Sequence, residues 1–309
     1  MGTRDSGATP RRRPHKALVA GAVAATSALL LSGCAGEWPD ASIGNFFLPD
    51  ASKGATNMTG RISTLWDGSW IAALAVGILV WGLTIWTVVA YRRRKKDPEF
   101  PAQVRYNMPI EILYTIVPVM MVGVLFYYTA RDQQAVLDTS KPADVTIDVV
   151  GKKWSWDFNY LDEQNSPVAY DTGRQADLSG NSGVEDQLPT LYLPVNESVE
   201  FHLYSRDVIH SFWIPAFLFK MDTIPGSPNK FQVTPTKEGE FQGKCAELCG
   251  EYHSEMLFNV RVVSAQEYQQ HLDDLEAAGQ SGGLPTTLAG AEELAHVQAN
   301  SIVSNEEEN

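Results

Sequence analysis

Two long apolar runs stand out in the first half of the chain. Residues 70–91 read WIAALAVGILVWGLTIWTVVAY without a charged side chain, and as a helix they span roughly 33 Å, which is enough to cross a bilayer. A second run, residues 109–129, reads PIEILYTIVPVMMVGVLFYYT, and Pro118 predicts a kink inside it. The length and purity of the first run argue against two buried helices of a water-soluble protein.

The loop between these runs reads RRRKKDPEFPAQVRYNM and carries six basic residues. By the positive-inside rule such a loop is cytoplasmic. The pattern therefore predicts a hairpin of two transmembrane helices over residues 62–130, with both ends of the chain outside the cytoplasm. Near the start, the basic stretch RRRPHK precedes an apolar run over residues 17–31 that is too short to span a bilayer comfortably. This is typical of an export signal, which we expect to cover residues 1–33.

After Arg131 the pattern changes to short alternating or β-rich runs separated by turns rich in Pro, Gly and Asn. These runs are DVTIDVVG, WSWDFNY, LPTLYLPV, SVEFHLYS, NKFQVTPT, EGEFQGKC and MLFNVRVV. Such spacing predicts an all-β sandwich or barrel over residues 131–264. The polar residues 161–187 predict an inserted loop. Residues 265–309 predict an amphipathic helix followed by a poorly ordered tail.

The charge is distributed unevenly along the chain. Its net value is -13, and residues 131–309 carry 11 Lys and Arg against 29 Asp and Glu, whereas residues 1–130 carry 13 against 8. The acidic second half argues against nucleic-acid binding and favours a basic protein partner. A chain of 309 residues can bury a sizeable core, so its three cysteines are not needed as a disulfide framework.

Two of those cysteines lie in the segment CAELCGEYHSEM, residues 245–256. Structural zinc sites favour paired cysteine knuckles and do not use a thioether. Blue-copper sites use one Cys, two His and a weak Met, and here Cys249, His253 and Met256 have that order. The remaining histidine is expected from an earlier strand end, where His210 in DVIHSFWIP is well placed. Cys245 is one thiolate too many for a single ion, but two thiolates can bridge two copper ions.

Simpler explanations of these residues stay open at this level. His210 could be a hydrogen-bonded core histidine. Met256 begins an apolar strand and could be core. Cys245 and Cys249 could form a disulfide in an oxidising compartment, which would leave both histidines unexplained.

Behind two predicted membrane helices, the segments DVIHSFWIPAFLFKMDTIPG and CAELCGEYHSEM resemble subunit II of cytochrome c oxidase, over roughly residues 62–264. The resemblance implies a cupredoxin domain, a Greek-key β-sandwich or barrel, with a dinuclear copper centre called CuA. The side-chain ligands it implies are His210, Cys245, Cys249, His253 and Met256. It also implies that Glu247 gives its backbone carbonyl to copper and its carboxylate to a magnesium ion shared with subunit I.

The same resemblance also bears on other residues of this chain. Trp154 in KKWSWDFNY falls where the family's tryptophan receives the electron from cytochrome c, although such aromatics are more often sheet core. Glu111 matches the acid at the cytoplasmic mouth of a proton channel, although it could simply face the positive end of the helix dipole. Asp207 and Asp222 also match family positions, without a clear role.

The function implied is a one-electron relay from cytochrome c, or a cytochrome c domain, through copper to haem in subunit I. Oxygen is then reduced to water in another subunit, coupled to proton movement across a bacterial cell membrane. A copper-delivery or copper-storage lipoprotein is the main alternative, and the two spans and Trp154 count against it. A quinol oxidase lacks these ligands, and a nitrous oxide reductase is a soluble enzyme with a propeller domain.

One further resemblance concerns the start of the exported segment, residues 34–61. The sequence LLLSGC resembles the lipobox of bacterial lipoproteins, in which the cysteine, here Cys34, takes the lipid. A plain signal peptide, or an uncleaved hydrophobic arm, is the alternative.

Overall fold

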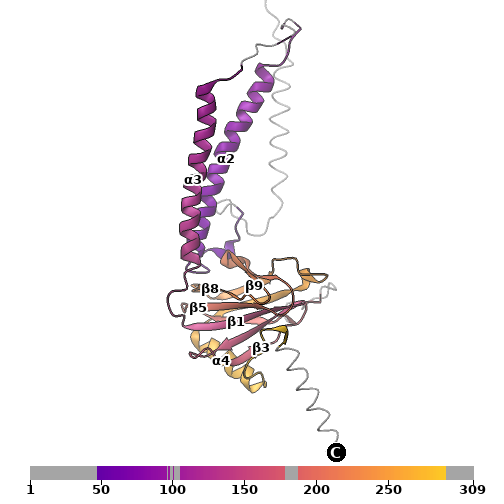
Figure 1. The fold of residues 1–309 in the computed structure, drawn as a ribbon. Coiled ribbons are helices and arrows are strands. Elements are labelled where there is room, and N and C mark those ends of the chain that lie inside the picture. Colours follow the sequence, from indigo (N-terminus) through magenta and orange to yellow (C-terminus); the bar gives the residue numbers. More distant parts are fainter. Residues whose placement is uncertain (1–46, 96, 98–99, 101–104, 178–186, 290–309) are drawn as a thin grey trace, which may run out of the picture. The chain divides into compact units, whose positions relative to one another are not determined.

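The computed structural model describes residues 47–95, 97, 100, 105–177 and 187–289 (Figure 1). The expected export signal and Cys34 lie outside these residues, as do residues 178–186 of the expected insertion and residues 290–309 of the tail.

Two long helices precede the β domain. Helix α2 covers Thr59–Ala90 and helix α3 covers Met108–Val136, and both are long and apolar enough to cross a membrane. They lie side by side (Figure 1), and Arg61 of α2 forms a 2.9 Å ion pair with the buried Asp132 of α3. Pro118 lies inside α3 as expected.

The β domain consists of two five-stranded sheets in the orders β3-β2-β1-β5-β8 and β4-β10-β9-β6-β7. Their strands are β1 Val145–Lys152, β2 Ser155–Leu161, β3 Pro167–Asp171, β4 Thr190–Pro194, β5 Val199–Ser205, β6 His210–Ile214, β7 Phe219–Thr223, β8 Asn229–Val233, β9 Gly239–Cys245 and β10 Leu257–Val263. The pairs β1 with β5 and β4 with β10 are parallel. The predicted fold class, two apolar helices followed by a β-sandwich of the cupredoxin type, is confirmed.

The core lies where alternate side chains of the two sheets meet. Strand β5 alternates buried and half-buried positions, and Val199, Phe201 and Leu203 are fully buried. Trp156 and Phe158 of β2 are also fully buried, and each such side chain contributes about 1.5–3 kcal/mol by leaving water. The alternation of side chains that predicted these strands therefore arises because one face of such a strand packs into the core.

Strands β3, β6 and β7 were not predicted from their own patterns. The expectation of a loop over residues 161–187 was wrong for β3, which pairs with β2 from Phe158 opposite Asp171 to Leu161 opposite Pro167. The edge of β2 offers main-chain hydrogen bonds to the short sequence PVAYD, so strand pairing outweighed the local preference for a loop here.

The C-terminal helix α4 covers Ala265–Ala277, as the sequence indicated, and the side chain of Ser264 caps it by accepting from the Glu267 amide. The expectation of a poorly ordered tail was wrong for the residues directly after α4. The Tyr170 amide donates to the carbonyl of Gln280 over 3.0 Å, and the Gly282 amide donates to Val168 over 2.9 Å. The open edge of β3 supplied these partners.

The segment before α2 is bound to the β domain. The Asn57 amide donates to the carbonyl of Thr234 over 3.0 Å, and the Thr236 amide donates to Ala55 over 2.9 Å. Ala55 is fully buried. The chain is therefore hydrogen-bonded to the β domain directly before the first membrane-competent helix begins.

Candidate metal centre

Neighbouring strand ends position the expected ligands. His210 is the first residue of β6 and Cys245 the last of β9, and the two strands pair with Phe212 opposite Cys245. His253 begins the short 3₁₀ helix η5, His253–Glu255, and Met256 directly precedes β10. Two neighbouring strand ends and one connecting loop thus bring together residues that are far apart in the sequence.

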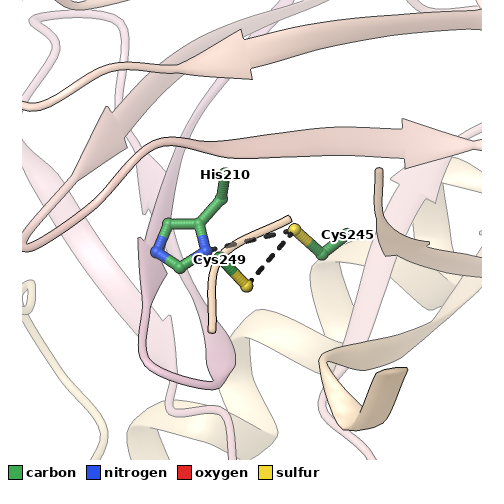
Figure 2. A group of neighbouring side chains, drawn as sticks. All are labelled: His210, Cys245 and Cys249. Atoms are coloured by element: carbon green, nitrogen blue, oxygen red, sulfur yellow. Dashed lines mark hydrogen bonds between the residues drawn. The ribbon is translucent and has the colours of Figure 1, made fainter. Parts of the chain in front are cut away.

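The sulfur and nitrogen atoms of these residues converge, and Figure 2 shows three of them, His210, Cys245 and Cys249. The Cys245 Sγ lies 3.9 Å from the Cys249 Sγ and 4.0 Å from the His210 Nδ1. The Cys249 Sγ in turn lies 3.5 Å from the His253 Nδ1 and 3.8 Å from the Met256 Sδ. Cys245, Cys249, His210 and Met256 are all buried, with Met256 and His210 fully so.

The two cysteines are free thiols. Their separation of 3.9 Å is far beyond the sulfur–sulfur bond of about 2.05 Å. A metal–thiolate bond is about 2.3 Å long, so one ion can contact both sulfur atoms at this separation. Together with imidazole and thioether groups, the donor set has the softness that copper prefers, and the residues present fit a copper centre.

The two thiols differ in acidity. Burial raises the pKa of Cys245, but hydrogen bonds with His210 and with the backbone at Glu247 and Ser211 outweigh it, so the net pKa is lowered. Burial, together with the nearby Cys245 charge, raises the pKa of Cys249 to about 12. Ionising the second thiol beside the first is costly without a cation, and a bound metal ion supplies that charge.

His210 is oriented by Asp207. The His210 Nε2 lies 2.7 Å from the Asp207 Oδ1, which leaves Nδ1 facing Cys245. Burial lowers the pKa of His210, but its bonds with Asp207 and Cys245 outweigh this and raise it. The sequence analysis gave Asp207 no definite role, although an acid three residues before a ligand histidine is a usable signal for such an orienting partner.

Glycine at position 151 makes room for the His210 ring. A Cβ atom there would lie 2.9 Å from the ring's Cδ2, closer than real Cβ atoms approach. The sequence analysis missed this residue, because a glycine inside a strand carries no sign of what lies against it.

Trp154 lies against the ligand loop. Its indole Nε1 donates a hydrogen bond to the Cys249 carbonyl over 3.3 Å, and its ring centre lies 4.9 Å from that of Tyr252. The neighbouring Trp156 and Phe158 are instead fully buried core residues. The aromatic segment thus combines the half-buried Trp154 with two residues of the sheet core, of which Trp156 also donates to the carbonyl of Met256 over 3.4 Å.

The remaining residues from the sequence analysis lie as follows. The Glu247 carbonyl accepts a hydrogen bond from the Cys245 Sγ over 3.2 Å, and the Glu247 side chain is exposed. The Glu111 carboxylate accepts from the Asn107 amide over 2.7 Å at the start of α3, a capping contact. Asp222 lies in β7 opposite Ser211.

Comparison with known proteins gives a consistent family. The sequence model described as "Cytochrome C oxidase subunit II, periplasmic domain" matches residues 145–263. The chain is 47% identical to a protein of Streptomyces avermitilis named "Probable cytochrome c oxidase subunit 2", over 90% of this chain and 92% of that protein. It is 35% identical to the "Cytochrome c oxidase subunit 2" of Mycobacterium tuberculosis, over 87% of this chain and 84% of that protein.

Among solved structures, the periplasmic domain of subunit II of cytochrome oxidase from Bradyrhizobium japonicum matches with 30% sequence identity and a TM-score of 0.39, over 45% of this chain and 97% of that one. The relative from Streptomyces avermitilis thus shares nearly half of its residues with this chain over most of both sequences. The chain belongs to the cytochrome c oxidase subunit 2 family.

Proposed function

We propose that this oxidase subunit holds a dinuclear copper centre, CuA, and is the part of the complex that receives electrons from cytochrome c. The observation that carries the proposal is the convergence of two thiols, two imidazoles and a thioether in one site, where all but the half-buried His253 are buried. The proposed side-chain ligands are His210, Cys245, Cys249, His253 and Met256. The Glu247 carbonyl, which already faces the Cys245 sulfur at 3.2 Å, completes the set.

Two ions fit the donor set better than one. A single blue-copper ion uses one thiolate, whereas Cys245 and Cys249 lie side by side and each has its own histidine, His210 and His253. When bound, a copper pair supplies one-electron acceptance and release. The protein's part is to hold the ligands in place, because Asp207 fixes the His210 ring and strand pairing fixes Cys245.

The proposed route of the electron begins at Trp154. Its indole is half-buried, touches Tyr252 and donates to the carbonyl of the ligand Cys249, so a short chain of contacts leads from the surface to the site. The acidic second half of the chain favours a basic cytochrome c as donor. Haem in subunit I is the proposed acceptor, and oxygen reduction takes place there.

Two acids receive proposed roles from the family resemblance. The carboxylate of Glu247, an exposed residue whose carbonyl faces the Cys245 sulfur, would hold a magnesium ion shared with subunit I. Glu111 would stand at the mouth of a proton channel. Its capping contact with the Asn107 amide places the carboxylate at the first turn of α3 and is compatible with that role.

The two membrane-competent helices and the family together make this a membrane protein with a periplasmic-type domain. We further propose that the export signal is removed and that Cys34 carries a lipid, on the strength of the sequence LLLSGC.

Copper stoichiometry of the purified full-length chain tests the proposal. We expect two coppers per chain and, with one electron removed, a single unpaired spin shared between two copper nuclei. Electron paramagnetic resonance then shows more hyperfine lines, more narrowly spaced, than one nucleus gives. One copper per chain, or zinc in equal amount to protein, would contradict it. Two coppers in a chain that no cytochrome c reduces would favour the copper-delivery alternative.

A further inference from the structure

A buried ionic cluster lies on the face of β2 opposite the core. Trp156 and Phe158 face the core, yet Asp157 between them is also fully buried. The Asp157 carboxylate forms ion pairs with the Lys152 Nζ over 2.6 Å and with the Arg206 Nη2 over 2.8 Å. Burying charges is costly unless they are closely paired, and none of these three groups belongs to the copper site's donor set.

The segment after α4 covers this cluster. The Arg206 Nε donates to the Pro285 carbonyl over 2.6 Å. Asn159, which is buried beside Asp157, exchanges two hydrogen bonds with the main chain of Leu284, each 2.9 Å long. At Gly283 a Cβ atom would lie 2.6 Å from the Cβ of Pro167, so a residue without a side chain permits the close approach. We call residues 280–285 the tail segment.

The cluster is connected to the copper site through the main chain. Arg206 precedes Asp207, the residue that orients His210. The Arg206 amide donates to the Gly151 carbonyl over 3.0 Å, and the Lys153 amide donates to the Asp207 Oδ2 over 2.7 Å. The loop that carries Asp207 is therefore attached to the end of β1, where Gly151 also lies against the His210 ring.

Neutralising Asp157 does not by itself account for Arg206. Lys152 already provides one positive charge at 2.6 Å, so Arg206 adds a second cation to a single carboxylate. A guanidinium has donors in a rigid planar arrangement, and here it is fixed at two points, Asp157 and the Pro285 carbonyl. Fixing the side chain at both points restrains the main chain at Arg206, and with it the adjoining Asp207.

We propose that Arg206, held between Asp157 and the tail segment, is a positioning residue for the copper ligand His210. The inference rests on the copper centre proposed above. It gives the tail segment, which lies beyond the residues matched by the family model, a function in supporting the site.

Two variants, each assembled in its oxidase, test this: Arg206→Gln in the full-length chain, and a shortened chain that ends at Gly279. Arg261→Gln is the matched control, because Arg261 lies in β10 of the other sheet and its ion pairs, with Glu240 of β9 and Glu267 of α4, are exposed. We expect both test variants to keep two coppers but to change the hyperfine pattern and the reduction potential in the same direction. Combining them should add little, since both act through one contact. The control should match the unmodified chain.

Hydrogen exchange of the copper-free chain provides a readout that does not depend on the metal. Because the Val208 amide donates to Asp207, we expect exchange in the peptide containing Val208 to become about tenfold faster in both test variants. If the unmodified chain holds no copper pair, the proposed function fails and this measurement still decides the role of Arg206.

Unchanged spectra, potential and exchange in folded variants would overturn the proposal. If Arg206→Gln or the shortened chain fails to assemble, Gly283→Ala decides, since it keeps every charged group and displaces only the tail segment. Gly283→Ala with the spectrum and exchange of the unmodified chain would likewise overturn it.

Discussion

The indole Nε1 of Trp154 lies 3.3 Å from the main-chain carbonyl oxygen of Cys249 and donates a hydrogen bond to it. This joins a half-buried aromatic ring directly to a proposed copper ligand. We expect Trp154→Phe to keep both coppers and the spectrum, but to slow reduction by cytochrome c by about tenfold or more, equivalent to about 1.4 kcal/mol of barrier. Stopped-flow reduction of the purified oxidase by cytochrome c measures this rate.

Trp213→Phe is the control for that experiment. Trp213 is also half-buried, but it stacks beneath the Lys244 ammonium at 4.7 Å. Reduction should proceed at the unmodified rate. Equal slowing by both variants, or none by either, would remove Trp154 from the proposed route.

The two cysteines should respond differently to replacement by serine. Cys245→Ser leaves Cys249, which lies within 4 Å of both His253 and Met256, together with His210. This is the blue-copper ligand set, so we expect one copper and a mononuclear spectrum. Cys249→Ser removes the sulfur that contacts both of these groups, and we expect it to lose most of the copper. Metal analysis together with electron paramagnetic resonance distinguishes these outcomes. Two coppers in either variant would contradict the proposal that both cysteines bridge the copper ions.

Much of the fold was predictable because its signals are local. The two long apolar runs predicted α2 and α3, and the alternation of apolar and polar residues predicted strands such as β5 and β10. Strand β3 and the tail segment were not predictable, because each depends on the other's main-chain edge rather than on its own side chains.

The candidate ligands could be named from residue type and order, since copper requires those side chains whatever their surroundings. The residues that hold these ligands in position could not all be named in this way. Asp207 and Arg206 are near His210 in sequence, but Gly151 and the two partners of Arg206, Asp157 and Pro285, are distant, and these contacts exist only after the sheets pair. Likewise, the local aromatic pattern did not separate the half-buried Trp154 from the fully buried Trp156; only the family resemblance selected Trp154.

Docking of the donor should depend on salt. The acidic excess of residues 131–309 attracts a basic soluble cytochrome c, and the screening length falls from about 10 Å at 0.1 M to about 3 Å at 1 M salt. The second-order rate of reduction should therefore fall as ionic strength rises. A flat profile in the intact oxidase would instead indicate a donor held within the same complex.

The lipid on Cys34 can be checked directly. Mass spectrometry of the mature chain should find an acylated cysteine at its N-terminus, and Cys34→Ala should leave the signal uncut while the membrane helices still insert. An unmodified N-terminus at another residue would contradict the lipid and leave the copper proposal intact.

The last prediction concerns acid stability and His271 of α4. Its ring stacks on Tyr192 at 3.7 Å, and burial is the main cause that lowers the pKa of His271 from 6.5 to about 4. The unfolded chain therefore binds a proton between pH 6.5 and 4 that the folded chain does not, so this histidine favours unfolding as the pH falls through that window. After allowance for solvent around the partly exposed ring, we expect a loss of about 1–2 kcal/mol by pH 4.5.

The measurement is the thermal midpoint of the copper-free chain at pH 7 and pH 4.5, beside His271→Phe, which keeps the stacked ring but cannot bind a proton. Between these pH values the unmodified chain should lose about 2–8 °C more than the variant, because other titrating groups, such as His202, act equally in both. An identical decline in the two proteins would show that the ring is protonated without cost, which would require α4 to leave Tyr192 uncovered.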